Sequence, residues 1–376
     1  MNYKFIDLFS GIGGFRLAFE DLGCKCVFSS DIDKFANQTY KKNFGDEPHT
    51  DITKVKEEDI PSFDILLAGF PCQPFSYAGQ NKGFEDKTRG TLFFDIVRII
   101  KHHRPKMFLL ENVKGLKSHK KGETLQVIES TLRNLDYDIH WEIIDSLKFG
   151  VPQKRERWYC VGFDKKIKFQ FPKGSNIRKT LKDILDENSN QDPSLKLTDF
   201  EIDRIQYHFQ SNEIRVKHDN SRYEPHTKKG KHGIYSFQKP DGSLRFHVGD
   251  RAKTQIQEAF YSCVDTYACT IIANRVPKLW DIKRKLSVRE AARIQGFPDS
   301  FEFPVSNAQA YKQLGNSVVV PVIRAISQKM LEAYANEELR LDLFDFQKLG
   351  KKVINKKHII KQTPSSEIIC NTYDCF

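Results

Sequence analysis

The chain has 376 residues, 39% hydrophobic and 12% aromatic, a composition typical of a soluble globular protein whose length favours two domains. Its formal net charge of +11 favours a polyanionic partner. No apolar run reaches the roughly 20 residues that span a bilayer, and the N-terminus lacks the pattern of an export signal. We therefore expect a cytoplasmic protein without a membrane segment.

The eight cysteines are expected to be reduced thiols, because nothing in the sequence indicates export. None shows the C-x2-C spacing of a structural zinc site, so no metal is predicted.

The first 165 residues alternate strand-like and helix-like segments, the pattern of a doubly wound α/β sheet. Strands are predicted at residues 4–9, 26–30, 63–68 and 107–110, with two more around a polar loop within 138–163. Helices are predicted from about residue 15 and at 91–102. Helical periodicity returns from residue 286, and QAYKQLGNSVVVPVIRAI is predicted to form a turn followed by an apolar helix. Residues 348–361, with six lysines, suggest a solvated tail.

A glycine-rich turn, SGIGG, follows the first predicted strand and lets a ligand approach the backbone at a helix N-terminus. Gly11, Gly13 and Gly14 depart from the dinucleotide fingerprint, which has a further spaced glycine. Asp31 ends the second strand, where an acid can bond ribose hydroxyls. Together these features suggest an adenosine-containing cofactor, and a structural turn with a solvated acid is the alternative.

The segment GFPCQPFS places Cys72 on a stiff turn after an apolar strand, the edge where open α/β sheets bind ligands. This is a position for a nucleophile, although an inert buried cysteine is the alternative. Glu111 ends another strand at the same edge and can serve as an acid. Arg155 and Arg157, in QKRER, can orient a carbonyl or phosphate or form a plain surface charge run.

Residues 211–257 contain ten Lys/Arg, five Asp/Glu and four His interleaved with aromatic residues. This composition suits a surface that meets nucleic acid, and a solvated insertion is the alternative.

In this order, DLFSGIGGF, GFPCQPFS, ENV, QKRER, RKLSVREAARIQGFPD and QAYKQLGNSVV closely resemble the motifs of the DNA (cytosine-5)-methyltransferase family, particularly bacterial restriction-modification enzymes. The resemblance covers residues 4–163 and 284–326. It implies an α/β class I S-adenosylmethionine-dependent methyltransferase fold, a Rossmann-like mixed sheet with helices on both faces, plus a smaller irregular target-recognition domain. It places the catalytic domain at 1–172, completed by 284–335, the recognition domain at 173–283 and a C-terminal extension at 336–376.

The resemblance also assigns roles in cytosine methylation. Cys72 would add to carbon 6 of a flipped-out cytosine, Glu111 would act at ring nitrogen 3, and Arg157 and Arg155 would orient the base oxygen and a phosphate. Contacts with S-adenosyl-L-methionine carry over to Phe9, Gly11, Gly13, Asp31, Asp51, Ile52, Phe70, Pro71, Leu92, Asn316 and Ser317. Many relatives have tryptophan where this chain has Ile32, which puts stacking on the adenine in doubt.

DNA contacts are expected in the segment 75–89, which can close over the flipped base, and at a threonine-aliphatic pair in the recognition region. They carry over to Ser76, Ala78, Gln80, Arg89, Thr270 and Ile271.

The sequence thus predicts a monomer that methylates a short site in double-stranded DNA and protects it from a restriction endonuclease that shares the site without binding this chain. The alternatives are a transfer RNA cytosine-5 methyltransferase and a catalytically inactive DNA-binding regulator. A nicotinamide oxidoreductase leaves the Pro-Cys-Gln segment unexplained.

Overall fold

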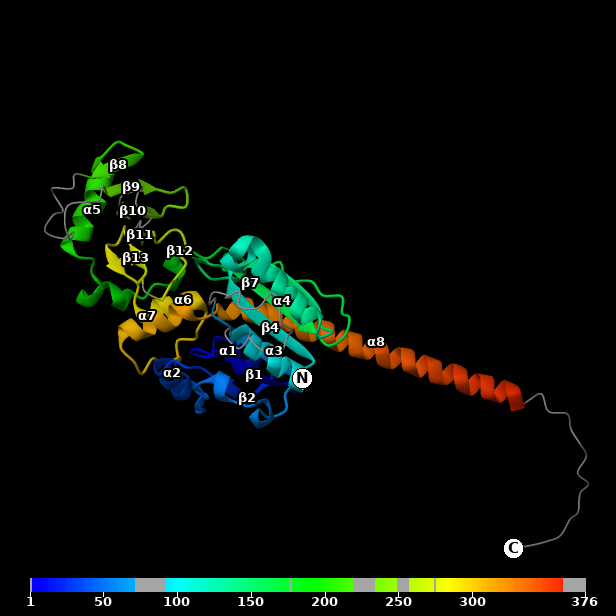
Figure 1. Cartoon of the computed structure of the whole chain (residues 1–376). Helices are drawn as coiled ribbons and strands as arrows, with labels where there is room; N and C mark the ends of the chain where they lie inside the picture. Colours follow the sequence, from blue (N-terminus) through cyan, green and yellow to red (C-terminus); the bar gives the residue numbers. More distant parts are fainter. Residues whose placement is uncertain are drawn as a thin grey trace, which may run out of the picture. The chain divides into compact units, whose positions relative to one another are not determined.

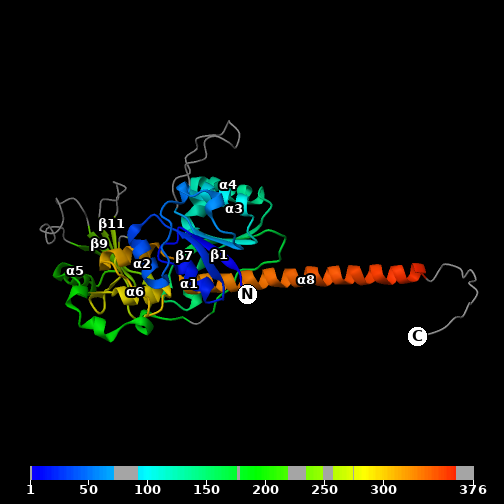
Figure 2. The same ribbon diagram turned by 90° about the horizontal axis from the view of Figure 1, so that it is seen from below.

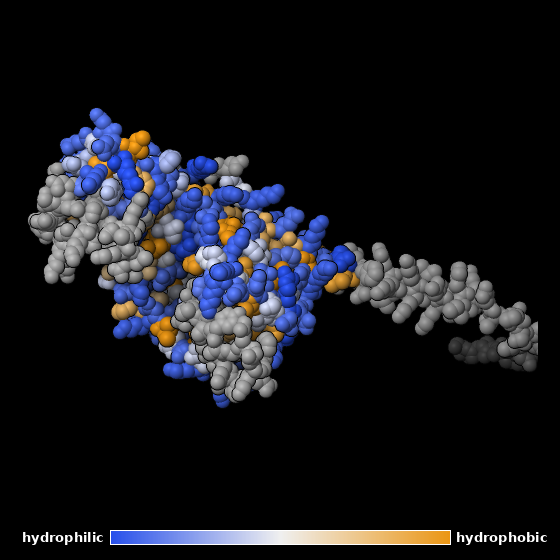
Figure 3. All heavy atoms as spheres, turned by 45° about the horizontal axis from the view of Figure 1, so that its top comes forward, coloured by the Kyte–Doolittle hydropathy of each residue, from blue (hydrophilic) through white to orange (hydrophobic). Residues whose placement is uncertain are grey.

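A computed structural model describes residues 2–71, 92–175, 178–218, 234–248, 257–273 and 275–360. The chain divides into two compact units, Met1–Met330 and Leu331–Phe376. No helix of the described ranges is long and apolar enough to cross a membrane. Hydrophilic side chains dominate the face seen in the space-filling view (Figure 3). The expected domain boundaries at 172 and 283 stay predictions.

The first unit is built on a six-stranded sheet in the order β2-β1-β3-β4-β7-β5 (Figure 1). Neighbours among β1 to β4 run parallel, whereas β7 is antiparallel to both β4 and β5. The strands are β1 (Lys4–Leu8), β2 (Lys25–Ser30), β3 (Ile65–Gly69), β4 (Met107–Val113), β5 (Asp138–Asp145) and β7 (Glu156–Phe163).

Helices cover both faces of this sheet, with α3 and α4 on one side and α1 on the other (Figure 2). Apolar side chains of α3 and α4, such as Ile96 and Ile128, are fully buried against strand residues such as Leu66 and Phe108. On the other face the rings of Phe5 and Phe19 lie 5.5 Å apart. The α-helices of the described ranges are α1 (Gly14–Glu20), α2 (Lys34–Phe44), α3 (Leu92–His103), α4 (Glu123–Arg133), α5 (Asp199–Gln210), α6 (Val288–Gln295), α7 (Asn307–Asn316) and α8 (Val320–Ile360).

A second, antiparallel sheet has the order β11-β10-β9-β8 and packs against α5. Its strands are β8 (Arg215–His218), β9 (Ile234–Gln238), β10 (Leu244–Val248) and β11 (Gln257–Tyr261). The short strands are β6 (Gln153–Lys154), β12 (Ala268–Cys269), β13 (Lys278–Leu279) and β14 (Arg284–Lys285). Because β6 pairs with β12, the segment before β7 is joined directly to residues 268–269, within the predicted recognition domain.

Seven short 3₁₀ segments complete the described secondary structure. They are η1 (Ile52–Lys54), η2 (Glu57–Asp59), η3 (Lys114–Gly122), η4 (Ser146–Phe149), η5 (Leu181–Ile184), η6 (Glu187–Asn190) and η7 (Pro193–Leu195).

The predicted strands of the first sheet are confirmed, with ends that differ by at most three residues. In the segment predicted as a turn followed by an apolar helix, the first residues belong to α7, whose N-cap Ser306 accepts a hydrogen bond from Gln309 N, and residues 317–319 separate α7 from α8. Gly315 is required there for close packing, because a Cβ atom would lie 2.3 Å from the backbone nitrogen of Ala273. Residues 348–360, expected to be a solvated tail, are helical.

Candidate active site

A pocket of about 800 Å³ lies at the carboxyl edge of the parallel strands, where α/β sheets commonly bind ligands. Residues at or just after the carboxyl ends of β1, β2, β3 and β4 line one part of it, and residues of α7 line another. Helix α7 is held against this edge by two contacts. Lys312 Nζ lies 2.7 Å from Asp33 Oδ2, and the Thr39 hydroxyl donates to Gln313 Oε1 at 3.0 Å.

The glycine-rich turn forms one wall of the pocket. Gly13 has φ +82°, and a Cβ atom there would lie 2.2 Å from the ring of Phe44, so this position requires glycine. Phe9 adopts φ +56°, a conformation that costs a non-glycine residue about 1–3 kcal/mol and is typical of functional sites. Phe9 and Gly11 both line the pocket, whereas Gly13 is not among its lining residues.

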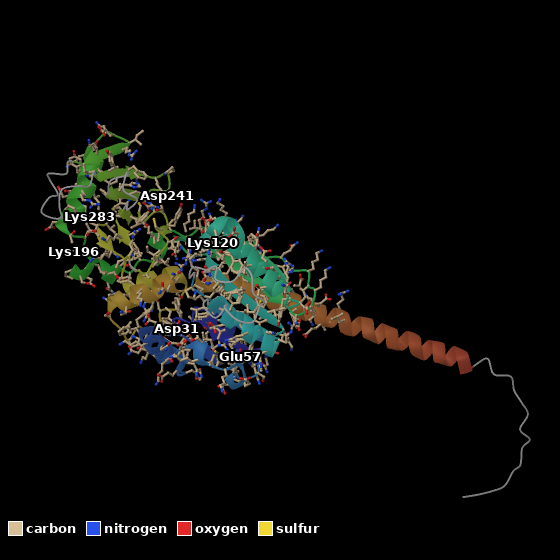
Figure 4. The ribbon with its side chains drawn as sticks, in the orientation of Figure 1. Asp31, Glu57, Lys120, Lys196, Asp241 and Lys283 are labelled. Carbon is tan, nitrogen blue, oxygen red and sulfur yellow. The ribbon has the colours of Figure 1, made fainter. Side chains whose placement is uncertain are left out.

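The carboxylate of Asp31 links the turn that follows β1 to the turn that follows β2. Its Oδ2 accepts from Gly11 N at 2.7 Å, and its Oδ1 accepts from Asp33 N at 2.7 Å. Burial raises the pKa of this carboxyl group, although the two backbone N–H groups oppose the shift. Each carboxylate oxygen has two lone pairs, so Asp31 can still accept a bond from a ligand hydroxyl. Figure 4 labels Asp31 between the N-terminal strands and α7.

Glu111 and Arg157 both line the pocket and face each other. Glu111 is paired in register with Gly69 on one side and Tyr159 on the other, which fixes its place in the sheet. Its Oε1 lies 3.2 Å from Arg157 Nε. Burial raises the pKa of Glu111, and the charges of Arg157 and Arg155 act against this shift. The pocket thus contains a carboxyl group with an increased tendency to hold a proton.

Asn112 connects the same strand to the residues just before Cys72. The buried amide Nδ2 donates to the carbonyl of Phe70 at 2.9 Å, and Oδ1 accepts from Val113 N at 2.8 Å. The backbone two residues before Cys72 is therefore fixed beside Glu111. Nothing in the sequence indicates this role, because it depends on a contact between positions 42 residues apart.

The guanidinium group of Arg155 is 3% exposed and donates to three backbone carbonyls. Nη1 bonds Ile271 O at 2.7 Å, and Nη2 bonds Gly315 O at 3.1 Å and Ser317 O at 2.7 Å. Burial of the charge, together with the nearby Arg157, lowers the pKa of Arg155 to about 9. The expected contact of Arg155 with DNA stays a prediction, and in this structure the residue joins three segments of the chain.

Thr270 and Ile271 are attached to the segment that precedes β7. The Thr270 hydroxyl donates to Lys154 O at 2.7 Å, and Ile271 N donates to Gln153 Oε1 at 2.9 Å. The next residue, Ile272, lines the large pocket. The structure therefore brings the threonine-aliphatic pair close to the site that Glu111 and Arg157 share.

Most of the residues expected to bind cofactor lie together in this one pocket. They are Phe9, Gly11, Asp31, Asp51, Ile52, Phe70, Pro71, Leu92, Asn316 and Ser317. The described residues do not include Cys72 or the expected DNA contacts Ser76, Ala78, Gln80 and Arg89. Pro71, which immediately precedes Cys72, lines the pocket. Lys312 and the 76% exposed Ile32 also line it.

Solved structures with the same fold include the S. pombe Dnmt2 methyltransferase and a putative DNA modification methyltransferase encoded within an E. coli prophage. Their TM-scores are 0.62 and 0.59 at 19% and 22% identity. The alignments cover 88% and 89% of this chain, and 99% and 100% of the two structures. Together with the mixed sheet, they establish the class I methyltransferase fold.

Residues 3–332 match the family model of C-5 cytosine-specific DNA methylases. The Type II methyltransferase M1.ScrFI of Lactococcus lactis subsp. cremoris is 47% identical over 88% of this chain and 78% of its own length. M.HpaII of Haemophilus parainfluenzae is 44% identical over 89% of this chain and 91% of its own length. The chain belongs to the C-5 cytosine-specific DNA methylase family and is a DNA (cytosine-5)-methyltransferase.

Proposed function

We propose that the large pocket binds S-adenosyl-L-methionine, which supplies the methyl group for carbon 5 of cytosine. The pocket fits this molecule in size and in the chemistry of its walls. Asp31 has lone pairs for ribose hydroxyls, and Asp51 and Ile52, which the resemblance assigns to the adenine, line the same pocket. The glycine turn allows close approach to the backbone at Gly11, and the exposed side chain of Ile32 offers an apolar surface.

One observation carries the proposed mechanism: Glu111 and Arg157 share the pocket with Phe70 and Pro71, which immediately precede Cys72. Cys72 adds as a thiolate to carbon 6 of the cytosine, which makes carbon 5 nucleophilic. Glu111 holds a proton at ring nitrogen 3, and its raised pKa supports this role. Arg157 orients the base oxygen. Once carbon 5 carries the methyl group that the cofactor would supply, removal of the proton from carbon 5 expels Cys72 and restores the ring.

Arg155 is assigned a positioning role within this mechanism. Its nitrogens bind the carbonyls of Ile271, Gly315 and Ser317, so it holds the recognition region and the end of α7 beside the QKRER segment. Direct contact with the base is assigned to Arg157, whose guanidinium faces Glu111.

The substrate is a short, specific site in duplex DNA, from which the target cytosine is flipped out of the stack. The segment 75–89 closes over that base, and Thr270 and Ile271 support the DNA. The chain acts as a cytoplasmic monomer that protects host DNA from a restriction endonuclease with the same site.

Transfer of tritium from labelled S-adenosylmethionine into duplex DNA tests this proposal, with transfer RNA as a parallel substrate. The expected product is 5-methylcytosine in DNA alone, and the Cys72→Ser variant should still bind the cofactor in calorimetry. Label in transfer RNA alone, or no label in either, would contradict the proposed function.

A further inference from the structure

Two glutamine side chains form a buried chain of hydrogen bonds between distant segments. Gln153 lies on β6 and Gln295 is the last residue of α6, and both are 0% exposed. Ile271 N donates to Gln153 Oε1 at 2.9 Å, and Gln153 Nε2 donates to Gln295 Oε1 at 3.0 Å. Gln295 Nε2 then donates to the carbonyl of Leu314 at 2.6 Å. The glutamine chain therefore runs from the predicted recognition domain to helix α7.

The two ends of the glutamine chain dictate which groups can stand between them. The backbone N–H of Ile271 can only donate, and the backbone carbonyl of Leu314 can only accept. Each bridging group must therefore accept on one side and donate on the other. An amide group does both, whereas a carboxylate has no donor and methionine has no N–H or O–H group. Because both glutamines are fully buried, a break in the chain leaves a polar group without a partner.

Both ends of the glutamine chain adjoin the wall of the large pocket. Residues 272–273 and residues 315–317, which follow the two ends directly, all line it. These two stretches touch each other, because a Cβ atom on Gly315 would lie 2.3 Å from the backbone nitrogen of Ala273. The recognition segment and the end of α7 therefore share one wall of the pocket.

A second connection runs beside the glutamine chain. Arg155 donates to the carbonyls of Ile271, Gly315 and Ser317. Ile271 is thus held at both of its backbone groups, by Gln153 at the N–H and by Arg155 at the carbonyl. With two connections between the segments, a displacement of either one is passed to the other.

We propose that Gln153 and Gln295 are positioning residues that couple occupancy of the large pocket to DNA binding. This inference rests on the proposed function, because it takes the large pocket as the cofactor site and residues 270–271 as a DNA contact. A cofactor that orders residues 315–317 also orders Ile271 through the glutamine chain, and DNA that orders Ile271 orders the pocket wall. Such coupling is reciprocal, so each ligand tightens the binding of the other by the same factor.

The test measures DNA binding with and without S-adenosyl-L-homocysteine, which is the cofactor without its methyl group. Fluorescence anisotropy uses a duplex that carries the site found by bisulfite sequencing of wild-type product. Saturating S-adenosylhomocysteine should tighten DNA binding by the wild type about fivefold or more. In Gln153→Met and in Gln295→Met this coupling factor should fall to about one. The double variant should lose no more coupling than either single variant, because the two side chains act as one unit.

Asn43→Leu is the matched control, because Asn43 is an amide residue that joins other segments and does not line the large pocket. Its amide bonds the backbone carbonyl and N–H of Glu302 at 2.8 and 2.9 Å. This variant should melt at a lower temperature and keep the coupling factor of the wild type. If the glutamine variants show the same pattern, their role is structural only and the inference is overturned.

A wild type that methylates DNA but has a coupling factor of about one would overturn the inference as well. Methionine at both positions leaves an apolar pair, so the double variant decides if a single variant does not fold. If no glutamine variant folds, hydrogen exchange of the wild type decides. S-adenosylhomocysteine alone should slow exchange at the Ile271 amide, and unchanged exchange there would refute the coupling. A wild type that leaves no 5-methylcytosine contradicts the proposed function itself.

Discussion

Replacing Arg155 with methionine removes the donor from three backbone carbonyls that belong to distant parts of the chain. Each buried carbonyl left without a partner costs about 1–3 kcal/mol. Part of this cost is offset because the variant no longer buries a charge. We expect a net loss of about 3 kcal/mol in the free energy of unfolding, which corresponds to a fall of about 4 °C in Tm for a chain of this length.

The assay is thermal unfolding by circular dichroism, combined with methyl transfer at saturating cofactor and DNA. Arg157→Met is the control, because Arg157 bonds Glu111 on a neighbouring strand that the sheet already holds in place. This variant should lose about 10²–10³ in kcat with little change in Tm. If Arg155→Met keeps the wild-type Tm, or if the two variants show the same pattern, the positioning role of Arg155 is refuted.

Three further predictions concern the large pocket. Burial raises the pKa of Glu111, so the wild type should lose activity as the pH rises through this raised pKa and the carboxyl group loses its proton. Glu111→Gln should lower kcat by a factor of about 10²–10⁴ and should lack this alkaline decline in a pH profile. Asn112→Ala should slow a single turnover and cost about 1–3 kcal/mol in a melting experiment, because the carbonyl of Phe70 loses its donor. Ile32→Trp should bind S-adenosylmethionine about fivefold more tightly in calorimetry, and equal or weaker binding would contradict the adenine placement.

The parallel part of the first sheet and the residues at its carboxyl edge could be predicted from the sequence. Strands such as Ile65–Gly69 are short apolar runs, and glycine, proline and acidic residues follow them directly. Because parallel strands end at one edge of a sheet, residues such as Asp31 and Glu111 had to come close together.

The contacts of Arg155, Asn112 and Lys312 could not be predicted, because they join positions that only the folded chain brings together. Arg155 meets Gly315 across 160 residues, and neither residue carries a local pattern that indicates this contact. The four-stranded sheet was missed because its strands are only four or five residues long, with polar and aromatic residues interleaved.

Bisulfite sequencing of plasmid DNA from cells that express this chain, compared with the Cys72→Ser variant, tests the central claim most directly. We predict protected cytosines within one short recurring sequence for the wild type and none for the variant. Protection that persists in Cys72→Ser would contradict the nucleophile, and the absence of protected cytosines in the wild type would contradict site-specific cytosine methylation.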